Sequence, residues 1–82
     1  MSDRDREMVT LQLRRDGRDA GEEMSAWLDL RDDGVGKELR RYLLNAVTRE
    51  GYSKRQLGDF ALQVWRGNRL VRTFVTVAKD GD

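Results

Sequence analysis

The sequence predicts a single α+β domain (ββαββ), a four-stranded sheet with one helix packed on one face. Three patterns lead to this prediction: alternating apolar residues in two stretches near the amino terminus, a helical stripe over 35–50, and two β-rich runs around Gly67-Asn68. The 82 residues suffice for one modest core but not for two. We therefore expect one domain over 8–78, with a disordered arm over 1–7 and a flexible tail over 79–82.

Two strands are expected in the first third of the chain. Over 8–14, apolar residues alternate with polar ones, which is typical of a strand with one buried face. A polar loop with two glycines follows over 15–23, and the alternation resumes over 24–30. In this second strand Trp27 falls on the outward side, so an aromatic residue is expected at the surface.

The segment after the second strand predicts a helix that ends near Glu50. Asp32 or Asp33 is suited to cap it, because a carboxylate accepts hydrogen bonds from the first free N–H groups and lies at the positive end of the helix dipole. Gly51 is expected to end the helix in the left-handed conformation, with Tyr52 folded back on the last turn. The residues expected to face the sheet are Val35, Leu39, Tyr42, Leu43, Ala46 and Val47.

Residues 53–65 fit two different structures. Ser53 and Gln56 have the spacing of a capping box, which favours a short helical turn, and apolar residues continue at helical spacing as far as Trp65. Gly58 and the β-rich run after Gly67-Asn68 favour a strand over the second half of this segment. The strand is the preferred interpretation, and a continuous helix is the alternative.

The hairpin around Gly67-Asn68 is apolar on both of its faces. Glycine at the first turn position supplies the positive φ of a type II′ turn. The pairs that follow are Val64 with Val71, Leu62 with Thr73 and Phe60 with Val75 on one face, and Trp65 with Leu70, Gln63 with Arg72 and Ala61 with Phe74 on the other. One helix covers only one sheet face, so the face with Trp65 is expected to be exposed.

Two hairpins joined by a right-handed crossover helix predict the strand order 2-1-4-3, with the first and last strands as parallel central neighbours. In this order Trp27 and Trp65 lie on opposite edge strands. The order resembles the β-grasp topology of ubiquitin-like proteins and of small immunoglobulin-binding bacterial domains. The runs Glu50-Gly51-Tyr52 and Leu62-Gln63-Val64-Trp65-Arg66-Gly67-Asn68-Arg69-Leu70 are also similar to the ubiquitin-like helix exit and strand-turn. This resemblance implies a protein-binding fold, and the ending Asp80-Gly81-Asp82 does not imply covalent tagging.

The composition argues against several kinds of chemistry. The chain has no Cys and no His, so it lacks thiol chemistry, the two commonest zinc ligands and the usual neutral-pH general base. It has no glycine-rich phosphate loop and no nucleophile elbow, and the acidic pair Asp32-Asp33 supplies too few ligands for Ca²⁺. We therefore expect no catalysis, no cofactor and no metal. Residues 1–7 are not a signal peptide and no apolar run reaches membrane-spanning length, which favours a cytoplasmic location.

The preferred function is a non-catalytic protein-interaction module, an adaptor that forms a homodimer through the outer face of its second hairpin. Large aromatic residues on a sheet face that no helix covers are typical of a contact surface. The residues expected to carry the contact are Trp65, Leu70, Arg72, Phe74 and Trp27.

The alternative function is nucleic-acid binding by basic side chains. Its residues are Lys37, Arg40 and Arg41 on the helix, Lys54 and Arg55 after it, and Arg66 and Arg69 on the hairpin. If 53–65 is helical, residues 36–65 resemble the first two helices of a helix-turn-helix. The formal net charge of only +1 weighs against this alternative, because nucleic-acid-binding domains normally carry a clear basic excess.

Overall fold

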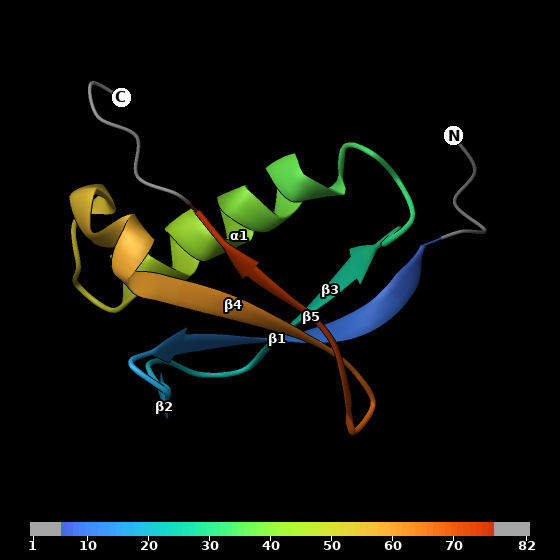
Figure 1. Cartoon of the computed structure of the whole chain (residues 1–82), viewed down its shortest axis with the longest axis horizontal. Helices are drawn as coiled ribbons and strands as arrows, with labels where there is room; N and C mark the ends of the chain where they lie inside the picture. Colours follow the sequence, from blue (N-terminus) through green and yellow to red (C-terminus); the bar gives the residue numbers. More distant parts are fainter. Residues whose placement is uncertain (1–5, 77–82) are drawn as a thin grey trace.

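Helix α1 (Val35–Arg49) lies across one face of a five-stranded sheet in the computed structural model of the chain (Figure 1). The structure describes residues 6–76. The strands are β1 (Glu7–Arg15), β2 (Arg18–Asp19), β3 (Met24–Leu28), β4 (Phe60–Arg66) and β5 (Arg69–Val75), and a 3₁₀ helix, η2 (Lys54–Asp59), precedes β4. The predicted α+β class is confirmed. Of the arm expected over 1–7, Glu7 already belongs to β1, whereas 1–5 and the tail over 79–82 lie outside the described residues.

Strand β1 occupies the middle of the sheet and pairs with three others. It is antiparallel to β2 and β3 on one side and to β4 on the other, and β5 pairs with β4 at the edge. Because β3 and β4 both run antiparallel to β1, they are parallel to each other, and α1 connects them across β1. The expected parallel pairing of the first and last strands is therefore wrong, and the chain departs from β-grasp topology at this point.

The side chains explain why β4 rather than β5 lies next to β1. Three of the seven residues of β4 are buried and the strand has its apolar side chains under α1, whereas none of the described side chains of β5 is fully buried. A strand in the middle of a sheet needs the more buried side chains, and charged side chains such as Arg69 and Arg72 are better tolerated at an edge.

A tight turn replaces most of the long loop that the sequence suggested over 15–23. Asp16 and Gly17 have φ values of 52° and 77°, and Arg15 pairs with Arg18 directly across them. Positive φ at both central residues is the requirement of a type I′ hairpin turn, and Asp-Gly meets it well. The remaining residues cross to β3, which pairs with the other half of β1.

The C-terminal end of α1 follows its sequence signal, whereas the expected carboxylate cap at the N-terminal end is wrong. Gly51 has a φ of 91°, its N–H donates to the carbonyl of Thr48 at 3.1 Å, and the N–H of Tyr52 donates to the carbonyl of Val47 at 3.1 Å. This pair of hydrogen bonds is the Schellman motif, so the predicted stop is confirmed. At the other end the carboxylate of Asp32 accepts from the N–H of Gly34, the residue just before the helix, rather than from its first turn.

The ambiguous segment 53–65 divides into a short 3₁₀ helix and a strand. The N–H of Ser53 donates to Oε1 of Gln56 at 3.1 Å, as the capping-box spacing predicted, and β4 begins at Phe60. The preferred strand is confirmed. The continuous helix, and with it the helix-turn-helix over 36–65, is wrong because residues 60–66 gain ladder hydrogen bonds on both sides.

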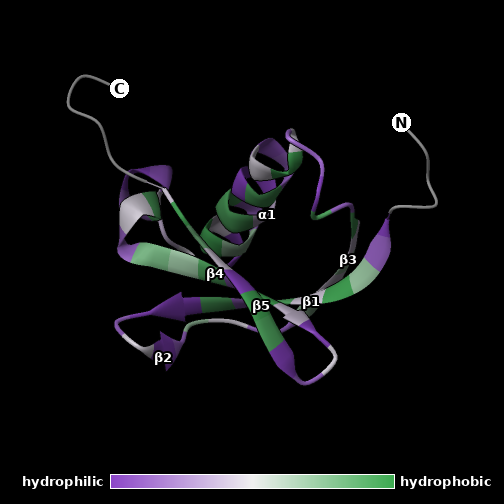
Figure 2. Cartoon of the chain, turned by 45° about the vertical axis from the view of Figure 1, so that its right-hand side comes forward, coloured by the Kyte–Doolittle hydropathy of each residue, from purple (hydrophilic) through white to green (hydrophobic). Residues whose placement is uncertain are grey.

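The core lies between α1 and the face of the sheet that it covers. Figure 2 shows apolar residues along α1 and the strands, with hydrophilic residues at the β1–β2 turn and at the tip of the β4–β5 hairpin. The buried apolar residues are Val9, Leu11, Leu13, Ala26, Leu28, Val35, Leu39, Leu43, Ala46, Val47, Leu57, Phe60, Leu62 and Val64. Tyr42, predicted to face the sheet, is half-buried against this cluster.

Candidate interaction surface

Strand alternation divides the sheet into a covered face and an outer face. The side chains of Val9, Leu11 and Leu13 are buried under α1, so the intervening residues of β1 point to the other side. We call that side, opposite α1, the outer face. The strand register places on it Met8, Thr10, Gln12, Arg14, Asp19, Ser25, Trp27, Ala61, Gln63, Trp65, Leu70, Thr73 and Val75.

The large apolar side chains that remain exposed among residues 6–76 all lie on this outer face. They are Met8 at 50% exposure, Trp27 at 57%, Leu70 at 42% and Val75 at 55%. Met8 pairs directly with Trp27 across β1 and β3, and Leu70 pairs with Trp65 across the hairpin. Exposed apolar side chains scattered singly are ordinary, but their concentration on one face marks a contact surface.

The two tryptophans lie much closer together than the predicted strand order implied. Trp27 is on β3 and Trp65 on β4, and these strands flank β1 on its two sides. Thr10 pairs with Trp65, and Met8, two residues earlier on the same face, pairs with Trp27. Strand spacing and rise place the two Cα atoms about 12 Å apart. Both aromatic side chains therefore belong to one surface.

A β-bulge removes two of the predicted contact residues from the outer face. The register of the hairpin shifts between Val64 and Trp65, where Val71 is the extra residue on β5. Beyond the bulge Phe74 pairs with Leu62 and Arg72 with Val64, which are residues of the covered face. Phe74 is half-buried against the core. Its assignment to the outer face is therefore wrong, and so is that of Arg72.

Sequence reasoning missed two apolar residues of the outer face. Met8 has a signal, because it alternates with Val9 and Leu11 and so belongs on the side opposite the core. The sequence carries no such signal for Val75, because only the bulge places this residue on the outer face, where it pairs with Ala61. Trp27, Trp65 and Leu70 lie on the outer face as expected.

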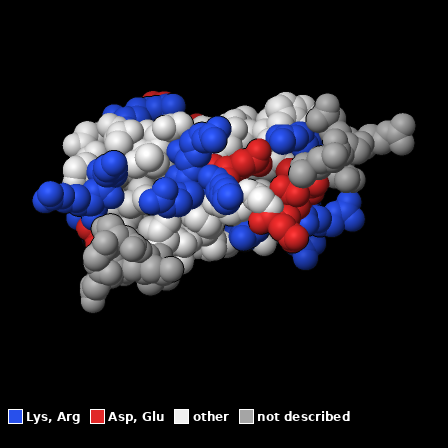
Figure 3. All heavy atoms as spheres, turned by 90° about the horizontal axis from the view of Figure 1, so that it is seen from above, with Lys and Arg blue, Asp and Glu red and all other residues white. Residues whose placement is uncertain are grey.

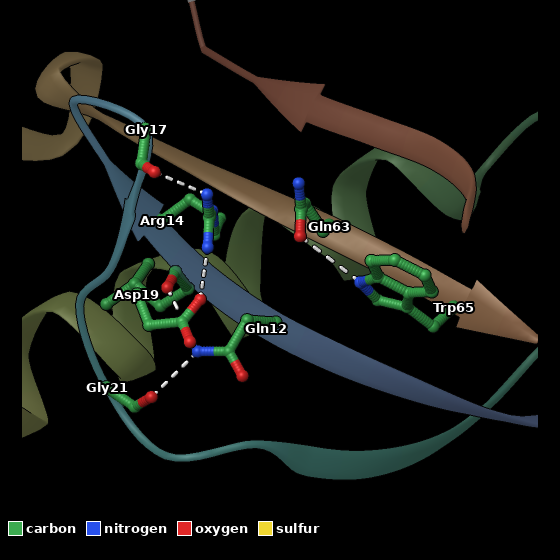
Figure 4. A network of polar contacts seen from close by, with 8 residues as sticks. Gln12, Arg14, Gly17, Asp19, Gly21, Gln63 and Trp65 are labelled. Atoms are coloured by element: carbon green, nitrogen blue, oxygen red, sulfur yellow. Dashed lines mark hydrogen bonds and ion pairs between the residues drawn. The ribbon is translucent and has the colours of Figure 1, made fainter. Parts of the chain in front are cut away.

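Five polar side chains of the outer face are hydrogen-bonded to one another or to nearby backbone (Figure 4), those of Gln12, Arg14, Asp19, Gln63 and Trp65. Nε1 of Trp65 donates to Oε1 of Gln63 at 3.2 Å, and Nε2 of Gln12 donates to the carbonyl of Gly21 at 2.8 Å. Arg14 forms an ion pair with Asp19. These two are the charged side chains that the strand register places on this face, so the register places no unpaired charge there.

Arg66 has a structural role on the covered face. Its Nε and a terminal nitrogen donate to the two carboxylate oxygens of Glu7 at 2.6 and 2.9 Å, which joins the start of β1 to the end of β4. The hydrogen bond from Arg66 lowers the pKa of Glu7, burial opposes this effect, and the charges of Arg66 and Arg31 add to it. The same pair raises the pKa of Arg66.

The basic residues of the alternative function are exposed but not gathered at one place. Lys37, Arg40 and Arg41 lie on α1, and Lys54 and Arg55 lie on η2. Figure 3, which looks onto the side carrying α1, shows Lys and Arg in separate groups with acidic side chains beside several of them. Arg66 and Arg69 pair at the hairpin tip, so the length of β4, about 20 Å, separates them from η2.

The described residues contain no group of three or more Asp or Glu arranged to hold a metal ion. None of the helices between residues 6 and 76 is both long and apolar enough to cross a membrane. No protein-family model, curated protein or solved structure matches this chain.

Proposed function

We propose that the protein is a non-catalytic interaction module that binds another protein chain through the outer face of its sheet. The observation that carries the proposal is the gathering of Met8, Trp27, Leu70 and Val75, exposed by 42–57%, on the one sheet face that α1 leaves uncovered. Tryptophan is enriched among the residues that dominate protein interfaces. We also propose that the protein acts in the cytoplasm, as expected from the sequence.

The distribution of charge favours a protein partner over a nucleic acid at this face. The centre of a protein interface is depleted of charged residues and enriched in aromatic residues and Met. The outer face follows this pattern, because its one cation, Arg14, is neutralised by Asp19. A nucleic acid needs several unpaired cations to neutralise its phosphates, and the strand register places none here.

A second copy of this chain is the partner that the surface fits best. In a two-fold symmetric interface the same patch meets itself, so any unpaired charge near the axis faces a like charge. The outer face avoids this penalty, and its amide and hydroxyl side chains such as Gln63 and Thr10 both donate and accept hydrogen bonds. Two sheets then pack face to face at a separation of about 10 Å.

The two tryptophans provide a direct test, because they are the only ones in the chain and both lie on the outer face. Light scattering after size exclusion, over a range of protein concentrations, should show a dimer. The emission maximum should move to shorter wavelength in step with the dimer fraction, because association removes the indoles from water. Replacing both Trp27 and Leu70 by Ser should weaken association at least 10-fold, as expected for central apolar contacts.

The matched control is Arg40→Ser, an exposed residue on the far side of α1. It should dimerise like the wild type. Circular dichroism on all variants separates loss of association from loss of folding. A wild type that stays monomeric at the highest concentration, with emission independent of concentration, contradicts self-association.

Nucleic-acid binding is the second candidate, favoured by the exposure of Lys37, Arg40, Arg41, Lys54 and Arg55 on the side carrying α1. It predicts affinity for DNA or RNA that falls steeply with added salt. The double variant Arg40→Gln with Arg41→Gln should lose this affinity, whereas Trp27→Ser should keep it. Absence of binding at low salt removes this candidate.

A further inference from the structure

A hollow of about 410 Å³ lies beside the hairpin tip and is lined entirely by arginines and aliphatic residues. Its lining consists of Arg66, Arg69 and Arg72 together with Leu30, Leu70 and Val71. The pairing of Arg66 with Arg69 and of Arg72 with Val64 directs the three guanidinium groups to the side of the hairpin that carries α1. The hollow is therefore a different surface from the outer face and shares only Leu70 with it.

Two of the three guanidinium groups have no partner within the described part of the chain. Arg66 is held by the carboxylate of Glu7 through two hydrogen bonds. The guanidinium groups of Arg69 and Arg72 form neither a hydrogen bond nor an ion pair with any other residue between 6 and 76. No acidic side chain lines the hollow, so it carries two positive charges that the described residues do not balance.

A bound anion would balance the charges of Arg69 and Arg72. Arg69 lies opposite Arg66, whose charge Glu7 balances, and Arg72 lies opposite Val64 on the same face of the hairpin, so Arg69 and Arg72 are neighbouring like charges. Two arginines side by side on one face of β5 are suited to hold an anion between them, because guanidinium groups bind phosphate and carboxylate oxygens in pairs of hydrogen bonds.

We infer that this hollow binds a small organic anion, with its phosphate or carboxylate group between Arg69 and Arg72 and its apolar part against Leu30 and Val71. The volume is within the range of small-molecule sites, which combine apolar walls with a few polar groups that fix orientation. Arg66 contributes less, because Glu7 already occupies its hydrogen-bonding edge. The inference stands independently of dimerisation.

The test is a titration of the ¹⁵N-labelled protein with four probes: phenyl phosphate, benzoate, inorganic phosphate and phenol. Phenyl phosphate or benzoate should produce saturable amide shifts in the segment 69–72 and around Leu30. The double variant Arg69→Gln with Arg72→Gln should weaken binding at least 10-fold. Arg55→Gln, which removes an exposed arginine on η2, should bind as the wild type does.

Tighter binding of phenyl phosphate identifies a phosphate ligand, and tighter binding of benzoate identifies a carboxylate. Both outcomes support the site. Phenol that binds as tightly as phenyl phosphate contradicts a role for the arginines, and inorganic phosphate that does so contradicts a role for Leu30 and Val71. Absence of saturable shifts, or unchanged affinity in the double variant, overturns the inference.

Discussion

At the scale of single residues, the ion pair of Glu7 with Arg66 ties together the ends of the two central strands. Because this contact lowers the pKa of Glu7 in the folded state, it stabilises the fold above the pKa of the unfolded chain. That stabilisation is lost as the pH falls through the lowered pKa and the carboxylate becomes protonated. Part of the free energy of unfolding therefore depends on pH through the ionisation of Glu7.

We expect Glu7→Gln to lower the free energy of unfolding at neutral pH and to have a smaller effect in acid, below the lowered pKa of Glu7, because the wild-type carboxylate is then protonated as well. Urea unfolding of both proteins at the two pH values measures this difference. Glu23→Gln, in the exposed loop before β3, is the control and should track the wild type. A difference that persists unchanged in acid contradicts the assigned role of Glu7.

Replacement by alanine should change the stability of the protein in opposite directions at Gly36, which lies in α1, and at Gly51, which follows the end of the helix. Gly51 has a φ of 91°, so Gly51→Ala should destabilise the protein by about 1–2 kcal/mol. Gly36 lies inside the helix with open space around its Cα, so Gly36→Ala should stabilise it by about 0.5–1 kcal/mol. Thermal unfolding of the two variants beside the wild type measures both effects. Equal effects of the same sign would contradict the capping geometry.

At the scale of elements, the bulge in β5 decides which residues of the hairpin support the fold and which lie outside. The turn and the pairing at its tip were predictable, because Gly67 supplies the positive φ that sets them. The bulge was not, because it depends on how Val71 and Phe74 pack against the core and not on local spacing. A shift of one residue moved Phe74 to the covered face.

Phe74 should therefore matter for stability and not for association. Phe74→Ala removes a half-buried ring from the core and should cost about 2 kcal/mol, roughly half of the loss for a fully buried phenylalanine. Val75→Ala, its neighbour on the outer face, should leave stability within about 0.5 kcal/mol. Urea unfolding compares the two. A Phe74→Ala variant as stable as the wild type would contradict the position of Phe74 on the covered face.

The strands themselves could be predicted from the sequence, but their order could not. Each strand longer than two residues appears within a few residues of its predicted bounds, because burial alternates locally. Their order depends on contacts between residues more than forty positions apart, such as Leu11 with Val64. The right-handed crossover rule does not require the two connected strands to be neighbours. It therefore also allows the arrangement found here, in which α1 connects β3 and β4 across β1.

At the scale of the whole molecule, the two faces of the protein differ in charge. The outer face has one ion pair and no other charge among its strand residues, while the side that carries α1 has exposed arginines and lysines (Figure 3). Strand alternation alone predicts the outer-face positions of Trp27, Trp65 and Leu70. The lining of the hollow beside the hairpin tip could not be predicted, because the bulge turns Arg72 toward it.

This separation predicts opposite responses to salt. Raising ionic strength from about 0.05 M to about 1 M should leave dimerisation unchanged or slightly stronger, because apolar contacts are not screened. The same change should weaken phenyl phosphate binding, because the Debye length falls to about 3 Å. Light scattering and the ¹⁵N titration measure the two effects in the same buffers. A dimer that dissociates in salt contradicts association through the outer face.

The central position of β1 has a consequence for synthesis of the chain. β1 is made more than forty residues before its partner β4, so a growing chain carries an apolar strand with one unpaired edge until residues 60–66 have been made. Until that partner emerges, the exposed ladder can capture a neighbouring nascent strand. Truncated products that stop before Phe60 should consequently aggregate rather than fold in part.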